Sequence, residues 1–187
     1  PLHPPEKTVW KTEENWFFKL SKYMPKLIEL IENDKTNYIF PEGKRSEILS
    51  KLKAEVKDIS LSRENVDWGI RVPWDETQTV YVWFDALVNY ISTLGWPNDD
   101  KNFSDYWPGI QVAGKDNLRQ QTAIWQAMLL SAGLPNSKQI FIHGFITSNG
   151  QKISKSLGNV VNPIELVEKY GTDATRYFLL AKLHPYE

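Results

Sequence analysis

Apolar residues in the first third of the chain recur every three to four positions, which is the spacing of amphipathic helices. The pattern predicts three helices, over residues 12–24, 25–33 and 41–56. A proline-rich stretch over residues 1–11 precedes them and is typical of a linker. The aromatic cluster at residues 16–18 is expected to pack in the core of this helical segment, because aromatic side chains contribute large areas to protein interiors.

From residue 58 onward, runs of β-branched and aromatic residues alternate with helical spacing. Strands are expected at residues 79–84, 110–113 and 140–146. Helices are expected at residues 86–94, 118–130, 163–170 and 172–183. The first of the strands is apolar or aromatic at nearly every position, which favours burial on both faces of a parallel sheet. Strands that alternate with helices predict an α/β fold with a doubly wound parallel sheet.

Helix-end signals are clearest near the C-terminus of the sequence. Asn162 is expected to cap a helix whose first position is Pro163, and Glu165 completes a capping-box-like arrangement. Gly171 is expected to end that helix, as Gly133 ends the helix over residues 118–130. These local signals predict helix boundaries independently of the rest of the chain.

Glycines and polar residues follow each expected strand. The strand ends carry Asp85-Ala86, Gly114-Lys115-Asp116 and His143-Gly144. Open α/β sheets bind ligands at the carboxyl ends of their strands, so these residues are candidates for a binding site. A loop over residues 151–159 comes next and contains Lys152 and Lys155. Two lysines among serines and flexible glycines suit phosphate binding, although a solvated basic loop also explains this composition taken alone.

Composition narrows the possible partners. The chain has 187 residues, 41% hydrophobic and 24% charged, which is ordinary for a globular domain with one substantial core. The net charge of -1 excludes nucleic-acid binding through a uniformly basic surface, so any contact with nucleic acid must be local. The sequence has no cysteine and three widely spaced histidines, so no metal site is expected within it. No apolar run is long enough to span a bilayer, so we expect no membrane partner and a cytoplasmic location.

Several motifs together resemble a known family. Lys-Ile-Ser-Lys-Ser at residues 152–156 resembles the Lys-Met-Ser-Lys-Ser loop of class I aminoacyl-tRNA synthetases. Together with that loop, Tyr-Val-Trp-Phe-Asp-Ala, Ala-Gly-Lys-Asp and Ile-His-Gly-Phe-Ile-Thr resemble the catalytic domain of methionyl-tRNA synthetases. The likeness covers only the second half of that domain. In the family, the first half, with a His-Ile-Gly-His-type motif, and an inserted connective region lie upstream.

The resemblance implies a fold and its boundaries. Residues 58–160 would form the second half of a Rossmann-like doubly wound parallel sheet with flanking helices, ending in the lysine loop. Residues 1–57 would be a helical segment that follows the connective region, and residues 161–187 would begin the helical stem-contact region. The implied function is ATP-dependent activation of methionine to methionyl-adenylate and transfer to tRNA. ATP would enter with magnesium as a substrate complex.

The resemblance also implies roles for individual residues. Lys155 would act in catalysis, with Lys152 assisting. The expected ATP-binding residues are Gly114, Asp116, Ile146, Ile153 and Lys155. The expected amino-acid-binding residues are Trp83, Ala86, Leu87, Tyr90, Asn117, Gln121 and Trp125. Aromatic walls suit the thioether of methionine, and the four-residue spacing within each set favours a shared helix face. Ordinary core packing is the alternative for Trp83 and Trp125.

The chain departs from the family pattern at two places, and two alternative functions stay open. Many family members carry an apolar residue after Gly-Lys-Asp and Phe-His further on, where this chain has Asn117 and Gln120-Gln121. Gln121 could replace the histidine as a hydrogen-bonding group. The alternatives are a leucine, isoleucine or valine synthetase, and a non-catalytic module that binds tRNA or protein. Because the upstream half of the catalytic domain is an expected partner, we expect this chain alone to be inactive.

Overall fold

The computed structural model describes residues 11–36, 38–54, 56–148, 150–153 and 158–181. Two compact units divide these residues. The first unit takes its residues from Pro1–Met24 and Glu55–Trp107, and the second from Pro25–Ala54 and Pro108–Glu187. Each unit has one three-stranded sheet, which is antiparallel in the first unit and parallel in the second.

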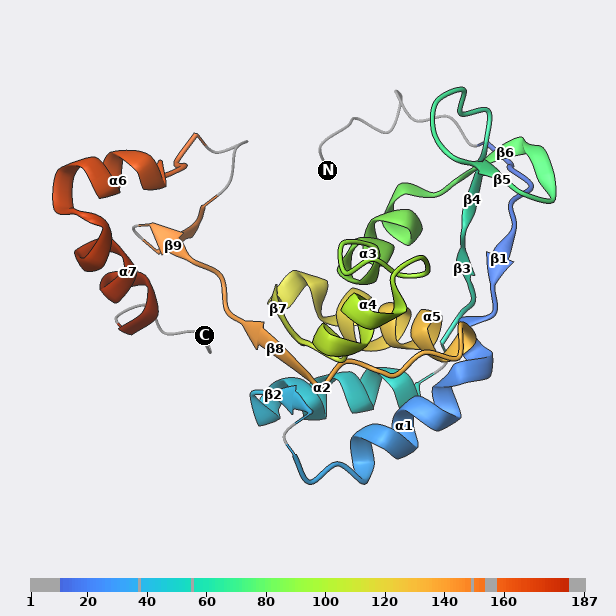
Figure 1. The fold of residues 1–187 in the computed structure, drawn as a ribbon, viewed down its shortest axis with the longest axis horizontal. Helices are drawn as coiled ribbons and strands as arrows, with labels where there is room; N and C mark the ends of the chain where they lie inside the picture. Colours follow the sequence, from blue (N-terminus) through green and yellow to red (C-terminus); the bar gives the residue numbers. More distant parts are fainter. Residues whose placement is uncertain (1–10, 37, 55, 149, 154–157, 182–187) are drawn as a thin grey trace. The chain divides into compact units, whose positions relative to one another are not determined.

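A three-stranded parallel sheet organises the second unit (Figure 1). Its strand order is β2 (Ile39–Phe40), β8 (Gln139–His143) and β7 (Ile110–Gly114). Burial alternates along β7 and β8, as expected for strands with one covered face. The predicted strands at 110–113 and 140–146 are confirmed, except that β8 ends at His143. The short β2 lies between the helices predicted at residues 25–33 and 41–56, where no strand was predicted.

Helices of the second unit begin and end largely where their sequence signals indicate. They are α1 (Met24–Glu32), α2 (Glu42–Lys53), α5 (Trp125–Ser131), α6 (Pro163–Tyr170) and α7 (Thr172–Ala181). Asn162 Oδ1 accepts a hydrogen bond from the Ile164 amide at 3.0 Å, which confirms the predicted cap of α6. Gly133 and Gly171 have φ values of +70° and +84°, and a helix ends at each.

The helix predicted at residues 118–130 is not regular. It starts after a 3₁₀ turn (Lys115–Asn117) and contains a π-helical turn (Gln120–Ile124) before α5. A π-helical turn is wider than an α-helical turn by about one residue and occurs frequently at functional sites. The spacing of side chains on this helix therefore differs from the regular α-helix that the sequence pattern predicted.

Arg45 joins α1 to α2. Its Nε and Nη2 atoms donate to the Ile31 carbonyl at 3.0 and 2.9 Å, and Nη2 also donates to the Glu32 carbonyl at 3.1 Å. The last carbonyls of a helix have no partner within the helix, so a guanidinium at this position satisfies them. Ile31, Ile48 and Leu52 are buried, which gives the two helices an apolar face each.

Antiparallel pairing organises the first unit. β1 (Phe17–Phe18) pairs with β3 (Ile59–Ser60), and β6 (Asp75–Val80) lies between β4 (Ser62–Glu64) and β5 (Arg71–Val72). Two helices follow, α3 (Val82–Ser92) and α4 (Asp100–Tyr106). A 3₁₀ turn (Leu20–Tyr23) precedes α1.

Three predictions for the first unit are wrong. Residues 12–24 contain β1 and a 3₁₀ turn instead of a helix, because Phe17 and Phe18 pair with a strand some forty residues later. The core position expected for the cluster at 16–18 is also wrong, since Trp16 is 44% and Phe17 57% exposed. The strand predicted at 79–84 ends at Val80, and the residues from Val82 onward are helical.

A short hairpin follows the parallel sheet, formed by β9 (Thr147–Ser148) and β10 (Gln151–Lys152). The first two residues of the predicted basic loop are therefore in a strand. The predicted residues Ser154, Lys155 and Ser156 lie outside the described part of the chain. None of the helices in that described part is long and apolar enough to cross a membrane.

Candidate nucleotide and amino acid site

The carboxyl ends of β7 and β8 bring three candidate residues together. Gly114 lies opposite His143 in the parallel register. A Cβ atom added to Gly114 would lie 2.9 Å from Asp116 Oδ1 and 3.7 Å from His143 Cε1. His143 Nδ1 is in turn 2.6 Å from the Gly144 carbonyl. The glycine thus makes room for a carboxylate and an imidazole at the same strand end, which is where α/β sheets bind ligands.

Lys115, directly after β7, and two isoleucines after β8 are further candidates in this unit. Lys115 Nζ lies 4.5 Å from the centre of the Phe145 ring, a favourable cation–π distance. The Ile153 amide donates to the Ile146 carbonyl at 3.3 Å, next to the hairpin of β9 and β10. The structure therefore brings together Ile146 and Ile153, two of the predicted ATP-binding residues. Lys152 is in β10, and Lys155 lies outside the described residues.

Four of the predicted amino-acid-binding residues are on α3, in the first unit. Trp83 is 62% exposed, which argues against the alternative that it is a core residue. Leu87 is buried, whereas Ala86 and Tyr90 are half-buried. Trp83, Leu87 and Tyr90 recur at i, i+4 and i+7, so they share one face of the helix. This face offers an aromatic surface beside buried aliphatic contacts.

The other three predicted amino-acid-binding residues are in the second unit. Asn117 ends the 3₁₀ turn and is exposed, Gln121 is buried in the π-helical turn, and Trp125 begins α5 with 1% of its surface exposed. Such burial is typical of a core tryptophan and also of the wall of a closed pocket. The joining of these residues and the α3 residues into one pocket stays a prediction.

A buried amide network beside these residues was missed in the sequence. Gln126 is fully buried, and its Oε1 accepts from Tyr38 Oη at 2.8 Å, Asn136 Nδ2 at 3.0 Å and the Ser137 amide at 3.1 Å. Its Nε2 donates to the Gln121 carbonyl at 3.0 Å and to Ser137 Oγ at 2.9 Å. The only signal in the sequence is one glutamine within the apolar run of α5.

Tyr38 contributes a hydroxyl that remains protonated. Burial raises the pKa of the Tyr38 phenol well above its usual value, and the negative charge of Asp34 raises it further. The Asp34 carboxylate also accepts a hydrogen bond from the Tyr38 amide at 2.6 Å. Because the phenol does not ionise at any physiological pH, it is a permanent donor to Gln126.

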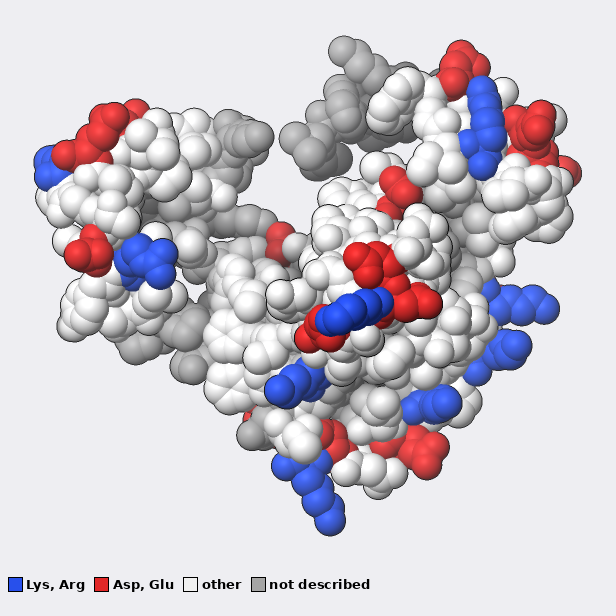
Figure 2. Space-filling model, viewed as in Figure 1, with Lys and Arg blue, Asp and Glu red and all other residues white. Residues whose placement is uncertain are grey.

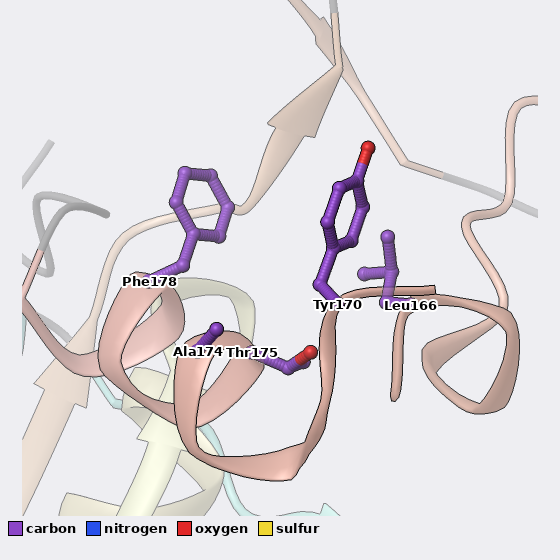
Figure 3. A pocket seen from close by; sticks show the side chains of 5 residues that line it. All are labelled: Leu166, Tyr170, Ala174, Thr175 and Phe178. Carbon is purple, nitrogen blue, oxygen red and sulfur yellow. The ribbon is translucent and has the colours of Figure 1, made fainter. Parts of the chain in front are cut away.

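An apolar groove lies on the helical pair α6–α7 (Figure 3). It has a volume of about 410 Å³ and is lined by Leu166, Tyr170, Ala174, Thr175 and Phe178. The Thr175 hydroxyl donates to the Gly171 carbonyl at 2.9 Å, so it is engaged by the backbone. The groove has no charged group in its lining and contains none of the predicted ATP-binding or amino-acid-binding residues.

The described charged residues do not gather into a metal site, and on the face in Figure 2 they are mixed in sign. Lys and Arg side chains are interspersed with Asp and Glu side chains on the face shown in Figure 2. Among the described residues, no three His, Cys, Asp or Glu side chains gather in a way that could hold a metal ion. The sites that the geometry favours are therefore local ones at the strand ends.

The parallel sheet has polar residues at its strand ends and is followed in the sequence by Lys152 and Lys155, as the resemblance to class I synthetases implies. The protein-family model described as tRNA synthetases class I (M) matches residues 4–187. The chain belongs to this family. The expected fold class, an α/β fragment with a parallel sheet and flanking helices, is thereby confirmed.

Individual relatives are methionine–tRNA ligases. The chain is 48% identical to the Brucella suis enzyme over 175 residues, which are 93% of this chain and 34% of that protein. It is 44% identical to the Nostoc sp. enzyme over 188 residues, 98% of this chain and 35% of that protein. The structure of Mycobacterium tuberculosis methionyl-tRNA synthetase bound by methionyl-adenylate is similar, with a TM-score of 0.86 and 40% identity over 94% of this chain and 34% of that one. The chain thus spans about a third of these relatives.

Proposed function

We propose that this chain is part of a methionine–tRNA ligase, which uses ATP to activate methionine and transfers the product to tRNA. The observation that supports this most is the likeness to a solved synthetase bound by methionyl-adenylate, at 40% identity and a TM-score of 0.86. The proposal is also supported by the glycine, carboxylate and imidazole that lie together at the ends of β7 and β8.

The nucleotide would bind at those strand ends. Asp116 can accept hydrogen bonds from ribose hydroxyls, and Gly114 lets the backbone approach the nucleotide closely. Ile146 and Ile153, joined through their backbones, would contact the adenine. ATP would arrive with its magnesium ion as a substrate complex.

Lysines after β8 would stabilise charge in the reaction. Activation joins the methionine carboxylate to the α-phosphate and releases pyrophosphate, so negative charge must be stabilised across the phosphates in the transition state. Lys155 would carry this role and Lys152 would assist. A charged group matched to the transition state contributes to rate more than to ground-state binding.

Methionine would occupy a pocket built from both predicted sets of side chains. The proposed wall residues are Trp83, Ala86, Leu87, Tyr90, Asn117, Gln121 and Trp125. The exposed Trp83 ring supplies a surface for the thioether, and Gln121 supplies a polar group where many relatives have histidine. We also propose a cytoplasmic location, tRNA as a partner, and the boundaries 1–57, 58–160 and 161–187 for the three segments.

Methionine-dependent exchange of pyrophosphate into ATP tests this proposal. We expect the full-length protein to exchange label with methionine and far less with leucine, isoleucine or valine. Binding of tRNA without any exchange would instead support a non-catalytic module, and preference for a branched amino acid would support another synthetase.

The chain alone should be inactive in the same assay. A class I site is assembled from both halves of the catalytic domain, and loss of one preorganised group alone costs on the order of a hundredfold to a thousandfold in rate. Addition of the upstream half should restore exchange. Robust exchange by the 187-residue chain by itself would overturn this expectation.

A further inference from the structure

The buried Gln126 amide has a fixed orientation. The Ser137 amide can only donate and the Gln121 carbonyl can only accept, so Oε1 must face the former and Nε2 the latter. Tyr38 and Asn136 add two donors to Oε1. The amide therefore makes five hydrogen bonds of 3.1 Å or less, all of them in the second unit.

These partners come from separate parts of the sequence. Tyr38 directly precedes β2, and Asn136 and Ser137 precede β8. Ser137 Oγ passes the network on to Gln111 Oε1 of β7 at 2.8 Å. Gln126 is thus anchored to the segments that lead into two strands. It is linked to the third strand through the Ser137 hydroxyl and by a longer bond of 3.4 Å from its Nε2 to Gln111 Oε1. These anchors fix its side chain relative to the parallel sheet.

The remaining bond of Gln126 reaches the π-helical turn. Nε2 donates to the Gln121 carbonyl, five residues earlier, so the side chain spans this turn from its C-terminal side. From the other side, Thr122 Oγ1 donates to the Leu118 carbonyl at 2.6 Å. A π-helical turn is rare in proteins, and here side chains bond one carbonyl within the turn, that of Gln121, and one just before it, that of Leu118.

We propose that Gln126 is a positioning residue for the amino-acid side of the site: it holds the wide turn that places Gln121 and Trp125. This inference rests on the proposed function, because those two residues are its proposed methionine contacts. Gln126 acts through the Gln121 backbone and touches no substrate. Its effect on methionine should therefore exceed its effect on ATP, whose proposed contacts Gly114 and Asp116 lie at a strand end.

Gln111 offers a matched control. It is buried like Gln126 and belongs to the same network, yet it bonds the sheet side and not the π-helical turn. Its Nε2 has no hydrogen-bond partner among the described residues. Methionine is close to glutamine in length and shape but cannot form these bonds, so Gln126→Met and Gln111→Met remove amides of equal size.

The test uses the full-length protein. Gln126→Met should raise the methionine KM about tenfold or more, because small misplacements of positioning groups can cost up to about a hundredfold. The ATP KM should stay within about twofold. Gln111→Met should leave both constants within about twofold, even though it also lowers thermal stability. Tyr38→Phe, which deletes one donor to Gln126, should raise the methionine KM less and in the same direction.

Equal changes in the two variants, or a joint rise of both KM values with Gln126→Met, would overturn the inference. If Gln126→Met does not fold, the contrast between Tyr38→Phe and Gln111→Met decides in the same way. Amide hydrogen exchange over residues 120–125 provides a readout without catalysis: Gln126→Met should speed it more than Gln111→Met. Absence of exchange activity in the wild type would defeat the proposed function, whereas unchanged amide protection would defeat the role of Gln126.

Discussion

Two stretches of the chain carry the same sequence signature and fold differently. Residues 75–92 and 110–131 each read as a β-rich run followed by helical spacing. In the second stretch, β7 pairs in a parallel sheet, and helical structure begins after Gly114. In the first, β6 is the middle strand of an antiparallel sheet and the helix begins within the apolar run. β-propensity indicates where extended chain is possible, and pairing decides its direction and its end.

Polar contacts explain the difference. β6 is held by its neighbours through buried polar residues: Thr79 Oγ1 donates to the Val66 carbonyl at 2.8 Å and accepts from Arg71 at 3.1 Å. These contacts place the strand earlier than its most apolar residues. Phe84 is then free to pack edge-on against Phe18, with the ring centres 5.5 Å apart, from the first turn of α3.

The largest contrast is expected between the two candidate tryptophans. Trp125→Ala should lower the free energy of unfolding by about 3–5 kcal/mol, since it empties a fully buried site. Trp83→Ala should change it by about 0.5 kcal/mol or less, because the ring is exposed. Denaturant unfolding followed by circular dichroism measures both.

The kinetics of these variants sharpen that comparison. Both alanine substitutions should raise the methionine KM and narrow the preference over leucine, if both rings line the pocket. If Trp125→Ala unfolds the protein and Trp125→Phe leaves all kinetics untouched, Trp125 is a core residue only.

Lys155→Ala should slow adenylate formation by about a hundredfold to a thousandfold while methionine binding changes little. The residue is the second lysine of the loop that follows the parallel sheet, and no comparable loop follows β6. Pre-steady-state activation at saturating ATP and methionine gives the rate. Lys138→Ala, at an exposed lysine of the same unit, serves as the control. An unchanged rate constant with Lys155→Ala would remove it from the mechanism.

Gly114→Ala should raise the ATP KM about tenfold, roughly 1.4 kcal/mol, with little loss of stability. Alanine tolerates the backbone of Gly114, with φ of -70°, but its Cβ would push the Asp116 carboxylate aside. Gly43→Ala, where an added Cβ meets nothing within 4 Å, is the matched control and should leave the KM unchanged. Equal effects of the two substitutions would argue against a role for the carboxylate position.

The smallest effect concerns pH and the antiparallel unit. The Thr77 hydroxyl and the Trp16 indole donate to Asp75 and hold the pKa of its carboxyl below the usual 3.8. Because the pKa of Asp75 is lower in the folded state than in the unfolded state, its ionised carboxylate stabilises the fold at neutral pH. This stabilisation is lost as the pH falls below 3.8 and through the pKa of the folded state. Trp16 fluorescence, taken as the difference from Trp16→Phe, should change in this range.

Asp75→Asn should abolish that change, whereas Asp105→Asn, at an exposed aspartate of the same unit, should preserve it. If the Trp16 fluorescence of the Asp75→Asn protein changes with pH as in the wild type, another group causes the change. The parallel unit should show no matching signal from Trp125, whose ring is buried.

Features that depend on residues close in sequence could be predicted, whereas features that depend on distant residues could not. Asn162, Pro163 and Gly171 mark their helix correctly, because caps depend on residues close in sequence. β2 has two residues and exists only through its pairing with β8, so no local pattern could reveal it. The strand ends at Gly114 and His143 were predictable from the α/β pattern. The hydrogen-bond network of Gln126 could not be predicted, because its partners are as far as 88 residues away in sequence.

The hydrogen bonds of Arg45 between α1 and α2 should depend little on salt concentration and pH. Exposed Lys–Glu pairs, such as Lys51 with Glu47 on α2, weaken when salt screens them or acid protonates the carboxylate. Arg45 also pairs with Glu42 on α2, but its bonds to α1 go to the main-chain carbonyls of Ile31 and Glu32, which do not titrate. Buffers that loosen the surface ion pairs of α2 should therefore leave α1 and α2 attached to each other.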